Sequence, residues 1–131
     1  MKFLIAFVIG VALGALSWIL PEAVTGKFEP FDNAIGFYLC EAILVLPLFF
    51  IGLRHGALPA LCATSGAWLG MNTYAYAAGS AETRAWIVLL LFSSLSLLII
   101  PAVFGVIGGI LHALLRRRRA RTATASSTPS A

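Results

Sequence analysis

The chain has 131 residues, of which 60% are apolar and only 11% are charged, and its mean hydropathy is +0.97. A soluble domain is nearer half apolar and a quarter charged, so this composition excludes a water-soluble domain and a disordered chain. The length excludes a large enzyme or a multidomain receptor, which leaves a small polytopic membrane protein.

Four stretches of the chain meet the requirement of about 20 predominantly apolar residues for one membrane crossing. They are residues 3–20, 34–53, 57–79 and 86–115. Lipid cannot satisfy exposed backbone N–H and C=O groups, so each stretch must be a helix. The sequence therefore predicts an all-α fold, an antiparallel bundle of four transmembrane helices over residues 1–115. The last stretch is longer than one crossing needs, which strong tilt, a kink at Pro101 or a helix that continues past the lipid surface would each explain. We favour a kink at Pro101, which lacks a backbone donor, with the last turns reaching the cytoplasmic headgroups.

The distribution of charge predicts the orientation of these helices. Acidic residues gather in the segments after the first and third stretches, whereas most basic residues lie at the opposite ends. These basic residues are Lys2, Arg54, Arg116, Arg117, Arg118, Arg119 and Arg121. The positive-inside rule then places both termini in the cytoplasm. Small size favours a prokaryotic inner membrane, and the arginine cluster is typical of contact with anionic lipid.

The two ends of the chain need separate interpretation. Residues 116–131 are basic and then rich in Ala, Ser and Thr, so we expect a disordered cytoplasmic tail. At the other end, Ala15-Leu16-Ser17 resembles a signal-peptide cleavage site, and cleavage before Trp18 would leave three crossings. We favour retention of the first stretch because it carries glycines that suit helix packing.

Small residues recur at four-residue spacing in three of the four stretches. In membranes this spacing allows close approach of helix backbones. The glycines concerned are Gly10, Gly14, Gly66, Gly70, Gly105 and Gly109. We expect them to pack helices within one chain, with a homo-oligomer interface as the alternative. Beyond this spacing, no internal repeat is evident.

Glu41 is the one charged residue within the predicted crossings. It cannot be moved out by shifting a boundary, because residues 42–53 are too few to cross. An unpaired carboxylate at that depth would cost about 3 kcal/mol or more, so we expect a neutral acid, with a water-filled cavity or a bound cation as the alternatives. Asn72 and Tyr76 are predicted at a similar depth, where they could join Glu41 in one polar site. The alternative is a hydrogen bond that only holds helices together.

Motifs of catalysis and cofactor binding are absent from the sequence. It contains no glycine-rich phosphate loop, no His-Glu-x-x-His and no Gly-x-Ser-x-Gly. The two histidines lack a third ligand, so no metal is expected. We therefore expect neither an enzyme nor a cofactor, and no nucleic-acid partner.

Two functions remain open at this stage. The broader expectation is a non-catalytic membrane accessory or interaction protein, embedded in the lipid bilayer and part of a homo-oligomer or a larger membrane complex. The alternative is a small proton- or cation-linked transporter or channel in which Glu41 is the titrating group.

Overall fold

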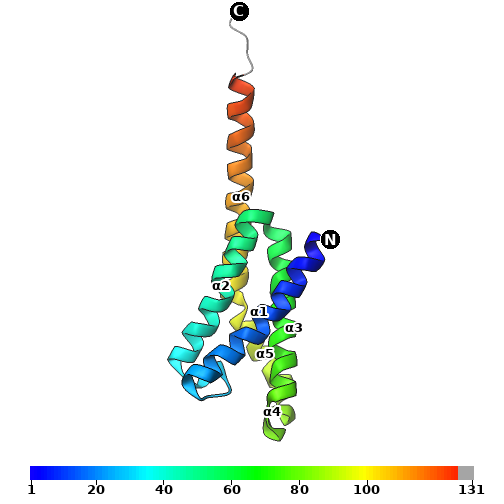
Figure 1. Ribbon diagram of the computed structural model, residues 1–131, viewed down its shortest axis with the longest axis vertical. Helices are drawn as coiled ribbons and strands as arrows, with labels where there is room; N and C mark the ends of the chain where they lie inside the picture. The colour runs from blue at the N-terminus through cyan, green and yellow to red at the C-terminus, as the bar shows by residue number, and fades with distance from the viewer. Residues whose placement is uncertain (127–131) are drawn as a thin grey trace, which may run out of the picture.

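The computed structural model describes residues 1–126, and within this range the chain is helical and contains no strand (Figure 1). The elements in chain order are α1 (Lys2–Thr25), a short 3-10 turn η1 (Pro30–Asp32), α2 (Ala34–His55), α3 (Ala57–Ala78), α4 (Ala81–Ala85), α5 (Ile87–Leu97) and α6 (Ile99–Ser126). The all-helical fold class is as predicted.

Three helical segments are long and apolar enough to cross a membrane. They are α1, α2 and the segment Ile87–Thr122, which combines α5 with most of α6. Helix α3 has 22 residues, enough for one crossing by length, but it is less apolar than the other three. It is also richly buried, with nine of its residues enclosed by neighbouring helices.

Local chemistry sets several helix ends. The side chain of Asn33 accepts a hydrogen bond from the Ile35 amide at 2.8 Å, so it caps the start of α2. Gly26 ends α1 in the left-handed conformation, at φ 67°, which favours glycine. Gly56, at φ 96°, makes the turn between α2 and α3 for the same reason.

The last predicted crossing is divided where the sequence suggested only a kink. Helix α5 ends at Leu97 and α6 begins at Ile99, and the Leu98 amide donates to the Leu95 carbonyl at 3.1 Å in a tighter turn. Pro101 explains the position, because it has no N–H for the Leu97 carbonyl and its ring clashes with that carbonyl in a regular helix. The break therefore precedes the proline by one turn.

Two predicted boundaries were too short. Helix α1 runs past residue 20 to Thr25, with Pro21 inside it. Helix α6 continues through Ser126, so the expectation of disorder from Arg116 is wrong for residues 116–126. Arg and Ala are good helix formers, and extending an existing helix needs no new nucleus. Residues 127–131 lie outside the described residues. In Figure 1, α6 projects beyond the other helices.

The core is formed where α1 packs along α3 and α2 packs along α6. Gly10 lies against Ala63 and Gly14 lies against Ala67, so α1 and α3 run in the same direction. The largest side chains that are fully enclosed include Trp18, Leu44, Leu48 and Met71.

All six glycines singled out from the sequence lie at helix contacts. Gly10 and Gly14 meet α3, Gly66 and Gly70 meet α1, Gly105 lies against Gly52, and Gly109 lies against Ala57. Gly52 and Gly108 make equally close contacts between α2 and α6, although the sequence analysis did not single them out.

Candidate functional site

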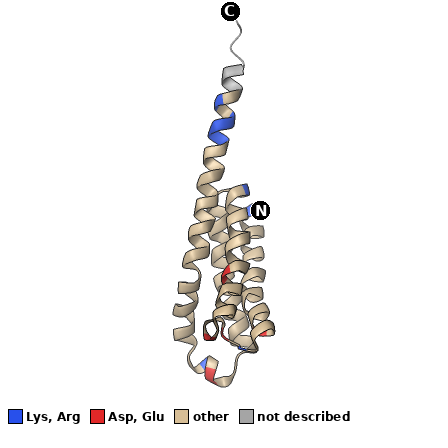
Figure 2. Cartoon of the chain, turned by 90° about the vertical axis from the view of Figure 1, so that its left-hand side faces the viewer, with Lys and Arg blue, Asp and Glu red and all other residues tan. Residues whose placement is uncertain are grey.

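Glu41 projects from the second turn of α2 into the bundle. The residue is only 8% exposed, and neither carboxyl oxygen has a hydrogen-bond partner among the described residues. Figure 2 shows an acidic position inside the bundle, apart from the acidic positions near the loops. A buried carboxyl without a partner is costly in its charged form, so this environment favours the protonated acid.

Asn72 is also buried, but its polar atoms are engaged elsewhere. Its amide nitrogen donates to the Trp68 carbonyl at 2.7 Å and to Ser94 Oγ at 3.0 Å. Ser94 in turn donates to the Leu91 carbonyl at 3.0 Å. These bonds join α3 to α5, so Asn72 connects two helices and does not hydrogen-bond to Glu41.

Tyr76 lies near the end of α3 and is 57% exposed. The Arg84 guanidinium lies 5.7 Å from its ring centre, and Arg84 Nε donates to the Tyr76 carbonyl at 3.1 Å. The structure therefore shows no hydrogen bond from Glu41 to either Asn72 or Tyr76.

Serine hydroxyls near the depth of Glu41 donate hydrogen bonds to carbonyls of their own helices. Ser17 donates to the Gly14 carbonyl at 2.7 Å, and Ser93 donates to the Leu89 carbonyl at 3.0 Å. Such bonds satisfy a hydroxyl without calling on another helix. They leave Glu41 without a hydroxyl ligand.

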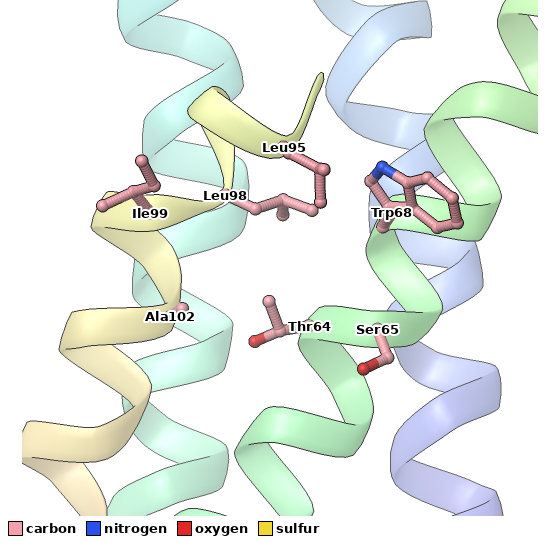
Figure 3. Close-up of a pocket in the computed structure, with 7 residues that line it drawn as sticks. All are labelled: Thr64, Ser65, Trp68, Leu95, Leu98, Ile99 and Ala102. Atoms are coloured by element: carbon pink, nitrogen blue, oxygen red, sulfur yellow. The ribbon is translucent and has the colours of Figure 1, made fainter. Parts of the chain in front are cut away.

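A groove of about 340 Å³ opens between α3 and the break in the last crossing (Figure 3). It is lined by Thr64, Ser65, Trp68, Leu95, Leu98, Ile99 and Ala102. The hydroxyls of Thr64 and Ser65 donate to carbonyls of their own helix, and Trp68 Nε1 donates to the Leu91 carbonyl at 3.3 Å. With its donors already engaged, the groove presents a largely apolar wall.

A second hollow lies among the connecting segments and carries acidic side chains. Glu29 and Asp32, from the segment around η1, share it with Glu82 of α4. Partial burial raises the pKa of Glu29, and the nearby charges of Asp32 and Glu82 raise this pKa further. Within residues 1–126, no three His, Cys, Asp or Glu side chains are grouped closely enough to hold a metal ion.

Side-chain bonds also link helices at this end of the molecule. The Tyr74 hydroxyl donates to Glu22 Oε2 at 2.9 Å, which joins α3 to α1. Trp18 packs edge-on against Phe28, at 5.4 Å between ring centres. Tyr74 and Glu22 are 52 residues apart in the chain, so no local sequence signal predicts their hydrogen bond.

The remaining candidate residues lie apart from Glu41. The arginine cluster is exposed on α6, and Figure 2 shows most of the basic positions toward the end of the molecule that holds both chain ends. His112 Nδ1 lies 2.9 Å from the Leu53 carbonyl and joins α6 to α2. Cys40 and Cys62 are both free.

Comparison with protein-family models, curated proteins and solved structures returned no match. The function must therefore be inferred from the site and the fold alone.

Proposed function

We propose that the protein crosses a membrane four times, with α1, α2, α3 and the α5–α6 segment as successive antiparallel crossings. Three of these segments have the length and hydropathy for a crossing. The remaining crossing, α3, is supported by its length of 22 residues and by its burial. A helix shielded by protein on several sides needs less apolar surface toward lipid.

The charge distribution supports cytoplasmic termini in a prokaryotic inner membrane. Lys2, the Arg54–Gly56 turn and the arginines of α6 share one end, while η1 and α4 carry acidic residues at the other. On α6, the exposed arginines beyond the bundle would meet the headgroups of anionic lipids.

The function that the geometry supports best is that of a non-catalytic membrane accessory protein that assembles with a partner in the bilayer. The observation that carries this proposal is that polar side chains within the bundle are used to join one helix to another. Asn72, Trp68 and His112 all form hydrogen bonds that join helices, which is a structural use.

This proposal is tested by extracting the tagged full chain from its native membrane into lipid nanodiscs without detergent. An accessory protein is expected to carry one partner at a fixed ratio, measured by quantitative mass spectrometry. The proposal is contradicted if the chain is recovered alone at every expression level, including the native one.

Glu41 favours a second candidate, a small proton- or cation-linked transporter. A buried carboxyl without a hydrogen-bond partner is rare unless it serves a function. In liposomes, Glu41→Gln should abolish cation flux driven by a pH gradient while leaving the fold intact. Glu82→Gln, which removes an exposed acid outside the bundle, is the matched control and should retain flux. Equal flux in wild type, both variants and empty liposomes would reject this candidate.

A further inference from the structure

The contacts between α1 and α3 occur in reciprocal pairs. A β-carbon at Gly10 would collide with the main-chain carbonyl of Ala63, and one at Gly66 would collide with that of Phe7. Gly10 and Gly66 stand 56 positions apart, and so do Phe7 and Ala63. Moving Gly10 forward and Ala63 back by 56 positions therefore turns the first contact into the second.

The same relation holds one turn further along these helices. Gly14 lies against the carbonyl of Ala67, and Gly70 lies against the carbonyl of Val11. Both glycines are again separated by 56 positions, as are Val11 and Ala67. Two consecutive turns thus share one offset.

The interface between α2 and α6 repeats this offset independently. Gly52 lies against the carbonyl of Gly105, and Gly108 lies against the carbonyl of Phe49. Gly52 and Gly108, like Phe49 and Gly105, are 56 positions apart. The next contacts agree as well: Gly52 with the amide of Gly109, and Gly108 with the amide of Leu53.

Reciprocal contacts of this kind define a two-fold interface, in which the same surface occurs on both partners. We infer that the chain consists of two equivalent helical hairpins in tandem, a first hairpin (residues 1–56) and a second hairpin (residues 57–112), packed about an approximate two-fold axis along the helices. The partner that fits the glycine-bearing face of each hairpin is thus a second copy of that hairpin, supplied by the same chain.

Identical residues at the interface support the equivalence. Gly10-x-x-Leu13-Gly14 in the first hairpin corresponds to Gly66-x-x-Leu69-Gly70 in the second, and Ile51-Gly52 corresponds to Ile107-Gly108. The matched glycines fall at the contact faces of two different helix pairs. Lipid imposes only hydrophobicity elsewhere, so little else in the two sequences need agree.

The two hairpins differ in their polar groups. The position equivalent to Glu41 is Leu97, and the position equivalent to Asn72 is Leu16. The break at Leu98 also has no counterpart in α2, which continues through Pro47. The shared feature is thus the glycine interface, and the buried polar groups are particular to one hairpin each.

The closest packing joins one hairpin to the other, so the covalent link between them should not be needed for association. The test uses the full chain with a protease site inserted between Gly56 and Ala57, in the turn that follows the exposed side chains of Arg54 and His55. After cleavage in mild detergent, the two hairpins should migrate together at a 1:1 ratio. Separation under conditions in which the uncut chain stays folded would overturn the inference.

Equivalence itself is tested by paired alanine substitutions in the cleaved protein. Gly10→Ala and Gly66→Ala should weaken association of the hairpins by similar factors, about tenfold or more. Gly52→Ala and Gly108→Ala should form a second matched pair. Gly105→Ala is the control, because its β-carbon would lie 3.1 Å from the Ala60 β-carbon and needs only a small adjustment. A pair in which one member weakens association tenfold and the other has no effect would contradict equivalence.

Discussion

The two halves of the bundle hold their helices together by different means. In the half nearer the Arg54–Gly56 turn, the main chains of paired helices touch at glycines such as Gly10 and Gly52, and the contact between His112 and the Leu53 carbonyl adds to them. In the half that carries η1 and α4, side chains make the connections, as in the Tyr74–Glu22 and Asn72–Ser94 hydrogen bonds. A glycine contact has no room for an added atom, whereas a region joined by several side-chain hydrogen bonds can lose one bond and keep the others.

The largest effect is expected from filling a glycine contact. Gly14→Leu should lower the free energy of unfolding by about 3 kcal/mol or more, because the side chain would overlap the Ala67 carbonyl. The matched control is Ala12→Leu, which adds the same side chain at an exposed position of α1 and should be nearly neutral. Thermal unfolding in detergent measures both. Comparable losses in the two variants would mean that the glycine contact is not tight.

A smaller effect is expected in the other half. Asn72→Ala and Ser94→Ala should each destabilise the fold by about 1 kcal/mol, with a coupling energy of about 0.6 kcal/mol in a double-mutant cycle. Ser65→Ala is the control, since this exposed hydroxyl donates only to the Leu61 carbonyl of its own helix. Full additivity of the Asn72 and Ser94 variants would show that the two side chains do not interact.

The smallest effect is expected in the hollow that Glu29, Asp32 and Glu82 share, and it depends on pH. The pKa of Glu29 is raised by burial and by Asp32 and Glu82, so the folded state holds this proton more tightly than the unfolded state. Stability should therefore decrease as pH rises from below the ordinary glutamate pKa through the raised value, and then level off. Glu29→Gln should reduce this decrease, measured as unfolding temperature against pH. An unchanged pH profile in the variant would contradict this account of the hollow.

The sequence was sufficient for the helical fold class and for the burial of Glu41. These features depend on local composition and on the length of an apolar stretch. The break at Leu98 was anticipated to within one turn, because Pro101 acts on the preceding turn of its own helix.

The pairing of polar side chains could not be obtained in the same way. Which face of a membrane helix meets its neighbour depends on rotation about the helix axis, and a helix that is apolar on all sides gives no signal for it. Asn72 was expected near the depth of Glu41, but its hydrogen bond to Ser94 depends on how α3 and α5 are rotated about their axes. The 56-residue repeat was hidden for a related reason, since it rests on a few contact residues.

The central claim is that the chain crosses a lipid bilayer four times, and α3 is the crossing that most needs a test. In a chain carrying Cys40→Ala and Cys62→Ala, single cysteines are introduced as Lys27→Cys, His55→Cys or Ser80→Cys, all at exposed positions. A membrane-impermeant maleimide is then applied to sealed vesicles of known orientation. Lys27→Cys and Ser80→Cys should react from one side of the membrane and His55→Cys only from the other. Reaction of Ser80→Cys from the same side as His55→Cys would show that α3 does not cross and would contradict the account.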